Sequence, residues 1–305
     1  MRKVEAIFCS DIHASSTPPV FRDNESDWFE AILRIFRQLK EIQKENGMPP
    51  IIIAGDIFDI PKTTPDIVNI LLREMPDCVY AIPGQHDLPY HNFEDIQQSS
   101  FDTLVAAGRI NLLDSNSPLK LDKFNIYGFP FGKPIEYNGV KSKKTKIAVI
   151  HSYIWIPNHN HVMAAETTNA TSPQWKKILK GFDIAVFGDN HSGFTQRDDD
   201  LLIYNCGCFM RRKQDEIKYK PAIGLLTEDG YIERHFLDCS LDKYSTIIKP
   251  FTPKEMLKTT ELIDELNGIT DIDLDIDNLI EAEMNIQKVN NGTRKFINKV
   301  MEDVK

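Results

Sequence analysis

The sequence lacks a long apolar run, and this lack bears on where the protein works. No stretch of about 18 consecutive apolar residues occurs, so we expect no membrane-spanning helix and no membrane partner. Met1-Arg2-Lys3 leads straight into an apolar segment without a small-residue cleavage site, so we also expect no secretion signal. Together these features predict a cytoplasmic protein.

Cysteine is scarce, with five residues that are scattered and odd in number, which disfavours a disulfide framework. Cys206 and Cys208 flank a glycine in the manner of a metal knuckle, but no second cysteine pair accompanies them. Cys9 and Cys78 lie in apolar runs and are interpreted as small core residues. We therefore expect no site built on thiolates.

An excess of positive charge is also missing, because 36 Lys and Arg stand against 45 Asp and Glu for a formal net charge of -9. The overall field repels polyanions, so a nucleic-acid substrate would need bound cations or local basic patches. The hydrophobic fraction of 41% is enough for a substantial core. A chain of 305 residues fits one large domain or a catalytic domain with an accessory one.

The first part of the chain alternates apolar runs with amphipathic segments of helical periodicity. Strands are expected at 4–10, 51–54, 78–82 and 110–113, with helices at 28–44, 65–75 and 100–107 between them. This order predicts a largely parallel sheet with right-handed crossovers.

The middle of the chain is richer in strands. They are expected at 124–129, 146–150, 184–187, 201–205, 223–227 and 231–238, with one helix from Ser172 to Gly181. Because so many strands exceed a single twisted sheet of ordinary width, we predict an α/β fold of two packed β-sheets flanked by helices, a four-layer α-β-β-α arrangement.

The last part of the chain changes character, being charged, poor in glycine and mostly of helical pattern. We predict a catalytic domain at 1–240 and a small, mostly helical appendage at 241–305 that caps the site or docks a partner. Two helices within it are expected at 279–289 and 294–304, separated by Asn290-Asn291-Gly292.

Residues of the same few types, Asp, His, Gly, Asn and Gln, follow five of the apolar strands. The junctions are FCSDIH from Phe8, IIIAGDIFD from Ile51, AIPGQHD from Ala81, IAVIHS from Ile147 and IAVFGDNHSG from Ile184. One Asp or His after a strand is usually a turn former or a helix cap. Five such loops at the carboxyl edge of a sheet, where ligands bind in open α/β folds, instead predict one metal site.

Oxygen and imidazole ligands without thiolates suit Mn²⁺, Fe²⁺ or Zn²⁺. A carboxylate from the middle strand can bridge two such ions. Two cations about 3.5 to 4 Å apart polarise a phosphoryl oxygen and activate water for attack on it. The residues alone therefore predict hydrolysis of phosphate esters.

The motifs DIH, GDIFD, GQHD, HS and GDNH, in this order, resemble the five motifs of the calcineurin-like metallophosphoesterases over residues 4 to about 238. Their spacing and the GDIFD form are most similar to the SbcD-type nuclease subunit of DNA double-strand-break repair. The resemblance implies a two-metal-ion phosphodiester hydrolase, a DNA exonuclease or endonuclease of repair, recombination or replication. The alternatives are a small-molecule phosphodiesterase or phosphatase, and a catalytically silent DNA-binding subunit.

The same resemblance implies a role for each matching residue. One ion would be held by Asp11, His13 and His191, the other by Gln85, His151 and Asp189, and Asp56 would bridge both. His86 would stabilise the transition state or protonate the leaving oxygen, with Asp87 orienting it. Asp59 is interpreted as a residue behind the ligands or as a loop cap.

Two positions depart from the family pattern, which usually has Asn in place of Gln85 and His in place of Asp189. Both fall on the second ion and make its surroundings richer in oxygen and more negative. This favours Mn²⁺ or Mg²⁺ over Zn²⁺ there. We expect two divalent ions, Mn²⁺ first, with Mg²⁺, Fe²⁺ or Zn²⁺ as alternatives; a weakened second site is the competing interpretation.

Weaker signals concern substrate and partners. His91, Arg211 and Arg212 are predicted to contact substrate, with solvated surface positions as the alternative. His159 and His161 are more typical of a polar loop. The helices at 279–304 resemble in position the family's ATPase-binding element, so the expected partners are DNA and an SMC-like coiled-coil ATPase, and a homodimer is left open.

Overall fold

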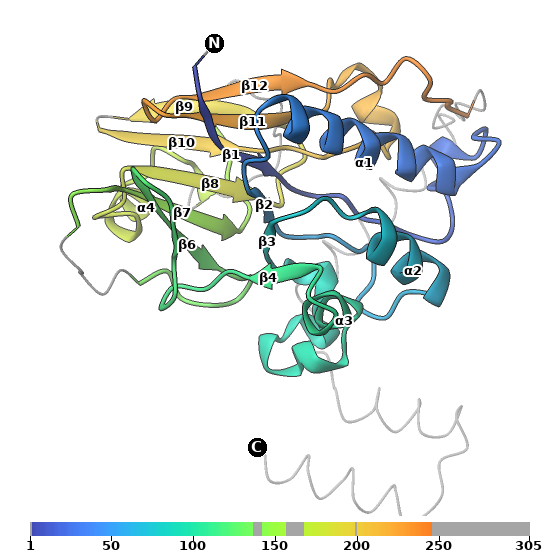
Figure 1. Ribbon diagram of the computed structural model, residues 1–305, viewed down its shortest axis with the longest axis horizontal. Coiled ribbons are helices and arrows are strands. Elements are labelled where there is room, and N and C mark those ends of the chain that lie inside the picture. Colours follow the sequence, from blue (N-terminus) through green and yellow to red (C-terminus); the bar gives the residue numbers. More distant parts are fainter. Residues whose placement is uncertain (1, 137–141, 157–167, 199, 246–305) are drawn as a thin grey trace, which may run out of the picture. The chain divides into compact units, whose positions relative to one another are not determined.

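Two six-stranded mixed sheets pack face to face in the structure, a computed structural model that describes residues 2–136, 142–156, 168–198 and 200–245 (Figure 1). These residues belong to one compact unit, Met1–Thr246. The predicted two-sheet fold with flanking helices is confirmed. The boundary at residue 240 stays a prediction, and the appendage from 246 onward, with its two expected helices, lies outside the described residues.

The first sheet has four parallel strands, which reach one edge, and an antiparallel hairpin at the other edge. Its order is β12 (Ile232–Phe236), β11 (Ala222–Thr227), β1 (Val4–Cys9), β2 (Ile51–Ala54), β3 (Val79–Ile82) and β4 (Ile110–Leu112). The register pairs Ile7 with Ile51 and Ile51 with Val79. The carboxyl ends of β1, β2 and β3 therefore lie side by side.

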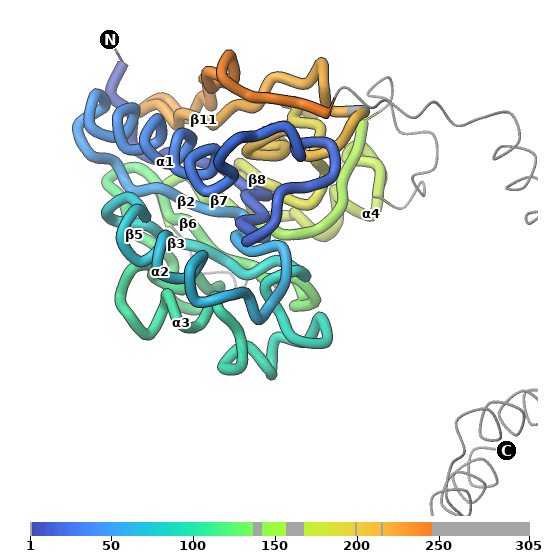
Figure 2. Tube along the Cα trace, turned by 90° about the vertical axis from the view of Figure 1, so that its right-hand side faces the viewer, coloured from blue at the N-terminus to red at the C-terminus, as the bar shows by residue number. Residues whose placement is uncertain are grey.

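The second sheet repeats this plan with antiparallel strands at both edges. Its order is β5 (Leu119–Lys120), β6 (Phe124–Phe129), β7 (Thr145–His151), β8 (Ile184–Gly188), β10 (Leu201–Asn205) and β9 (Phe194–Asp198). His151 pairs with Gly188 at the carboxyl ends of β7 and β8. Figure 2 looks onto the edge where strands of both sheets end, with the dark-blue segment after β1 in front.

The apolar side chains divide the unit into layers. Along β1 and β2, Ile7 and Ile53 pack toward the helices, whereas Phe8 and Ile52 face the second sheet. Because β2 is buried on both faces, it is a continuous apolar run, and in β1 only Glu5 is partly exposed. Trp175 and its neighbours cover the outer face of the second sheet.

The helices close the outer faces. They are α1 (Trp28–Glu45), α2 (Pro65–Glu74), α3 (Ser100–Ala106) and α4 (Pro173–Ile178), with 3₁₀ turns at Val20–Arg22, Gln85–Asp87, Pro89–His91, Phe93–Gln98 and Gln214–Lys218. Asp27 begins α1 by accepting the Glu30 N–H at 3.0 Å, which satisfies one of the free donors of the first turn. The predicted start of the second helix at Pro65 is confirmed.

The sequence pattern missed two strands and misplaced one cysteine. β9 has one buried residue, the apolar Phe194, and its other four residues are half-buried or exposed, because the strand pairs on one side only. β5 is two residues long. Cys9 is buried as expected, but Cys78 is exposed, since the chain turns through a positive φ of 56° just before β3. Among the described residues, no helix combines the length and the apolar character needed to cross a membrane.

Candidate metal and phosphoester site

The loops after β1, β2, β3, β7 and β8 meet at the carboxyl edges of the two sheets. The loops after β1 and β2 are joined by backbone hydrogen bonds, Asp11 N–H to Gly55 O at 3.1 Å and His13 N–H to Asp56 O at 3.0 Å. Asp11, His13, Asp56 and Asp189 all have positive φ, between 49° and 85°. Left-handed backbone at non-glycine residues is uncommon and clusters at functional sites, so these four positions mark the loops as built for their side chains.

Two glycines let these loops approach one another. A Cβ on Gly55, whose φ is +99°, would lie 2.0 Å from Nδ1 of His151. A Cβ on Gly84 would lie 2.1 Å from Oδ1 of Asp56. The glycines of GDIFD and GQHD are thus required because a metal-ligand candidate occupies the space that a side chain would fill.

Two histidines are held by backbone carbonyls through their Nδ1 atoms. His151 Nδ1 lies 2.6 Å from the carbonyl oxygen of Ala54, and His86 Nδ1 lies 2.9 Å from that of Asp59. A carbonyl oxygen only accepts, so each Nδ1 carries the hydrogen and donates it. The Nε2 lone pair of each neutral ring is then free for a cation or a substrate.

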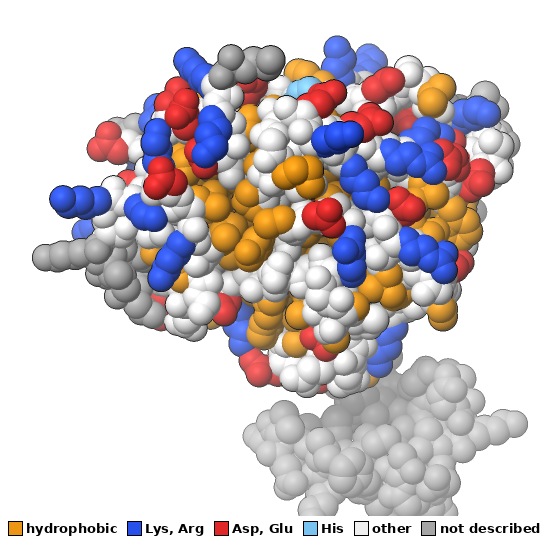
Figure 3. Space-filling view, viewed as in Figure 1, with side chains coloured by type: hydrophobic (Ala, Val, Ile, Leu, Met, Phe, Trp, Pro, Cys, Tyr) orange, Lys and Arg blue, Asp and Glu red, His pale blue; other side chains and the backbone are white. Residues whose placement is uncertain are grey.

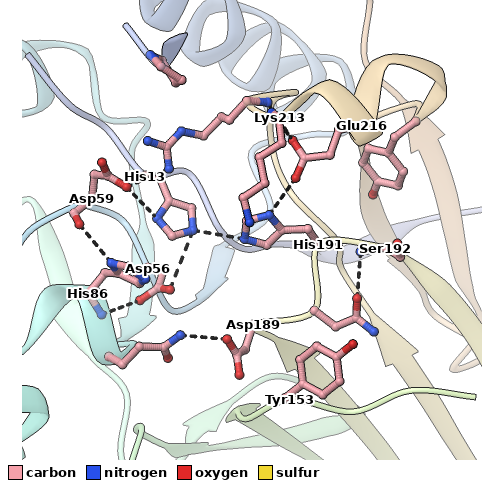
Figure 4. Close-up of a pocket in the computed structure, with 15 residues that line it drawn as sticks. His13, Asp56, Asp59, His86, Tyr153, Asp189, His191, Ser192, Lys213 and Glu216 are labelled. Carbon is pink, nitrogen blue, oxygen red and sulfur yellow. Dashed lines mark hydrogen bonds and ion pairs between the residues drawn. The ribbon is translucent and has the colours of Figure 1, made fainter. Parts of the chain in front are cut away.

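Carboxylates lie beside the Nδ1 atoms of two other histidines, with a hydrogen bond to one of them and an ion-pair contact to the other. His191 Nδ1 donates to Oε1 of Glu216 at 2.9 Å, and His13 Nδ1 lies 3.4 Å from Oδ1 of Asp59 (Figure 4). Glu216 also accepts the backbone N–H groups of Arg212 and Lys213. All four rings therefore direct Nε2 to the interior of the site.

Asp11, His13 and His191 form the first group of ligand atoms. The Nε2 atoms of His13 and His191 are 3.3 Å apart. Oδ1 of Asp11 lies 3.8 Å from Nε2 of His13 and 3.9 Å from Nε2 of His191. Two imidazole acceptors at this distance repel unless a cation lies between them. The donor set and its burial fit a divalent metal ion.

Asp56 stands between this group and a second one. Its Oδ2 is 3.3 Å from Nε2 of His151 and 3.7 Å from Nε2 of His13. Oε1 of Gln85 and Nε2 of His151 are buried and have no hydrogen-bond partner among the described residues. Unsatisfied buried acceptors are rare in folded proteins, so these two atoms also fit a cation. The amide nitrogen of Gln85 donates to Oδ1 of Asp189 at 2.7 Å.

The ionisation of the second group depends on the pair of Asp56 and His151. Burial raises the pKa of Asp56, but the charge and hydrogen bond of His151, together with the charges of His13 and His86, outweigh it and lower the pKa to about 2. Burial lowers the pKa of His151, and the carboxylate of Asp56 reverses this and raises the pKa to about 10. Without a metal ion, the proton on His151 balances the negative charge of Asp56. A bound cation would balance the same charge in its place.

Asp87 is bonded to backbone groups rather than to the ring of His86, and its predicted role toward His86 stays a prediction. The Asp87 carboxylate is fully buried and accepts the backbone N–H groups of Gly84 at 3.0 Å, Ile57 at 3.2 Å and Phe58 at 2.9 Å. It closes the short turn that it ends and ties the GDIFD loop to the GQHD loop. Nδ1 of His86 is bonded to the backbone carbonyl oxygen of Asp59.

The three residues predicted to contact substrate lie in different places relative to the pocket. Arg212 lines the pocket and donates to Oδ1 of Asp59 at 2.7 Å. Arg211 is bonded to the carbonyl oxygens of Ile217 and Cys239 and does not line the pocket, so its contact with substrate stays a prediction. Neighbouring residues of an extended segment face opposite sides, and the pattern alone does not fix which one enters the site. His91 is exposed and contacts the carbonyl oxygen of Gln85 at 3.0 Å, beside the pocket rather than in its lining.

The pocket over these groups has a volume of about 790 Å³ (Figure 4). Its lining also includes Lys213, which belongs to the basic cluster after the last metal loop, and Tyr153, Glu216 and Tyr219, which the sequence patterns did not single out. Glu216 is the most consequential of these because it fixes His191. It lies in an isolated 3₁₀ turn without any motif, so no local signal pointed to it. His159 and His161 lie outside the described residues.

Comparison with known proteins agrees with this geometry. A family model described as calcineurin-like phosphoesterase matches residues 6–193, more than half of the chain. No curated protein matched. Similar solved structures include an archaeal phosphodiesterase, with 14% identity, a TM-score of 0.41 and coverage of 76% of this chain and 99% of that one. Another is TT1561 of Thermus thermophilus, with 11% identity, a TM-score of 0.46 and coverage of 76% and 99%. The chain belongs to the calcineurin-like phosphoesterase family, which uses divalent metal ions, and it is a phosphoesterase that hydrolyses ester bonds.

Proposed function

We propose that the protein is a two-metal-ion phosphodiester hydrolase that cleaves DNA. The observation that carries the proposal is the place of Asp56, whose carboxylate lies between a group of two imidazoles and a second group with two unsatisfied buried acceptors. One carboxylate shared by two sets of donors is the arrangement that a pair of cations needs.

The residues that would hold the ions are Asp11, His13 and His191 on one side, Gln85, His151 and Asp189 on the other, and Asp56 on both. Bound there, divalent ions would polarise the phosphoryl oxygens and stabilise the charge of the transition state. The protein supplies the fixed directions of the donors, set by Ala54, Glu216 and Asp59 behind the histidines.

His86 is the proposed acid. Its ring lies against the ring of His13, with centroids 4.9 Å apart, and its Nδ1 is bound to the Asp59 carbonyl. The half-buried imidazole therefore presents Nε2 to the pocket, and in the doubly protonated ring this nitrogen would donate its proton to the leaving oxygen.

Arg212 and Lys213 supply positive charge at the pocket for the phosphates on either side of the scissile bond. The face shown in Figure 3 gives little help, because acidic and basic side chains are mixed on it, and the net charge of the chain is -9. DNA binding would thus be local to the pocket and dependent on its cations.

We further propose that the segment 241–305 docks an SMC-like coiled-coil ATPase, on the strength of its helical sequence pattern and of the motif resemblance. Cleavage of DNA by the full chain, measured with and without such an ATPase and ATP, tests this part. Equal rates in both reactions would contradict it.

The test of the main proposal uses labelled single-stranded and double-stranded DNA with the full chain and Mn²⁺. We expect Mn²⁺-dependent cleavage that His86→Ala slows by about 10²- to 10⁴-fold, the usual contribution of a general acid, with bound Mn²⁺ unchanged. Turnover of bis(p-nitrophenyl) phosphate with DNA left intact would instead indicate a small-molecule phosphodiesterase. Neither reaction, together with at most one bound ion, would indicate a silent subunit.

A further inference from the structure

We propose that Gln85 and Asp189 act as one hydrogen-bonded unit that selects a cation preferring oxygen ligands, Mn²⁺ or Mg²⁺, for the second metal position. The first position keeps the nitrogen-rich surroundings of two imidazoles. The inference rests on the proposed two-metal site and adds to it a difference between its two halves.

The contact between the two side chains gives Gln85 its direction. Its amide nitrogen donates to Oδ1 of Asp189 at 2.7 Å, a short hydrogen bond to a charged acceptor. This bond decides which end of the amide faces Asp189. The other end, Oε1, is left buried without a partner among the described residues, as a ligand oxygen would be.

The backbone of Asp189 is also fixed. Its N–H lies 3.2 and 3.1 Å from the two carboxylate oxygens of Asp11, and its φ is 85°. A ligand of the first group thereby positions a residue of the second. Asp, Asn and His tolerate positive φ better than most residues, so the backbone accepts either the aspartate found here or a histidine.

The two positions then differ in donor chemistry. The first has the Nε2 atoms of His13 and His191, 3.3 Å apart. The second has one imidazole, His151, with the amide oxygen of Gln85 and the carboxylate of Asp189. Carboxylate and carbonyl oxygens suit Mg²⁺ and Mn²⁺, whereas imidazole suits Zn²⁺ and other later metals. The pair therefore makes mixed occupancy the expected state when both kinds of ion are present.

If the two residues act as a unit, the losses of affinity in the two single variants should not multiply in the double variant. Gln85→Asn shortens the side chain by one methylene and takes the amide nitrogen out of reach of Asp189. Asp189→His removes the oxygen that orients Gln85. Changing both at once supplies an Asn and a His ligand, neither of which depends on the lost hydrogen bond.

The experiment titrates EDTA-treated full-length protein with Mn²⁺ and counts bound ions by electron paramagnetic resonance, then adds Zn²⁺ as competitor. We expect two Mn²⁺ per wild-type chain, with Zn²⁺ displacing the ion of the first position at lower concentration than that of the second. Gln85→Asn and Asp189→His should each weaken the second ion by about 10- to 100-fold, the range for residues that orient metal ligands. The double variant should regain the second ion and lose its preference for Mn²⁺ over Zn²⁺.

Two exposed changes of the same chemistry serve as controls, Gln98→Asn and Asp122→His, which should leave both ions unaltered. Circular dichroism in EDTA checks that each variant is folded. A loss in the double variant equal to the product of the single losses would overturn the inference, as would a wild-type chain that binds one Mn²⁺ only. Two Mn²⁺ ions with the expected selectivity but no DNA cleavage would support the inference and contradict the proposed function.

Discussion

Asp87 offers a sharp prediction because its hydrogen bonds are to the backbone rather than to the ring of His86. Its fully buried carboxylate accepts three backbone N–H groups, from Gly84, Ile57 and Phe58, at 2.9 to 3.2 Å. Asp87→Ala would leave three buried donors without an acceptor, at about 1–3 kcal/mol each. Allowing for relaxation of the loops, we expect the free energy of unfolding to fall by about 3–6 kcal/mol.

Asp87→Asn refines the magnitude. The amide keeps one oxygen, which can accept two N–H groups, and turns an NH₂ toward the third, so a smaller loss of about 2–3 kcal/mol is expected. The assay is urea unfolding of the metal-free protein followed by circular dichroism at pH 8. Burial, together with the neighbouring charge of Asp56, raises the pKa of Asp87 to about 7, so at pH 8 the wild-type carboxylate is ionised.

Asp122→Ala is the control, because Asp122 is solvent-exposed and lies outside the helices and strands, so its loss should change stability little. The reasoning would be refuted if Asp87→Ala kept the stability of the wild type within about 0.5 kcal/mol, the usual effect of a surface substitution. Unchanged stability with a large loss of hydrolysis would favour the view that Asp87 acts through His86.

Four further outcomes are expected. Mn²⁺ at 100 times its dissociation constant should stabilise the folded protein by about 2.7 kcal/mol, seen by calorimetry as a rise in Tm that EDTA reverses; an unchanged Tm would count against a metal site. Because the pKa of His151 is about 10 without metal, Mn²⁺ binding at pH 8 should release about one proton. Titration calorimetry in two buffers of different ionisation enthalpy should therefore give different heats of binding. Equal heats would contradict the pairing of His151 with Asp56. Glu216→Gln should weaken Mn²⁺ binding by about 10- to 100-fold through the orientation of His191, and equal affinity in the same titration would remove Glu216 from the site. Gly84→Ala should weaken binding of both ions, because its Cβ would lie 2.1 Å from Oδ1 of Asp56, the carboxylate that they share, and ion counting by electron paramagnetic resonance tests this outcome.

The fold was predictable where strand and loop signals were local. β2 is a continuous run from Ile51 to Ala54, which only a sheet covered on both faces accommodates, and it is buried throughout. The polar residues at the ends of five such runs had to meet once their strands were placed in two packed sheets. Asp11, Asp56 and His151 accordingly lie together as expected.

The remainder depended on contacts between distant segments. Whether Arg211 or Arg212 enters the pocket is decided by acceptors 28 and 153 residues away, Cys239 and Asp59. Glu216 became part of the site only through its contact with His191, and no periodicity marks it. β9 escaped detection because an edge strand needs few apolar side chains.

The central claim is that hydrolysis requires both groups of donors to be filled. The most direct measurement follows cleavage of a labelled DNA duplex by the full chain while bound Mn²⁺ is counted by electron paramagnetic resonance in the same samples. We predict that the rate rises only as the second ion binds, and that His86→Ala stays slow with two ions bound. A maximal rate with a single ion bound, or no cleavage with two, would contradict the account.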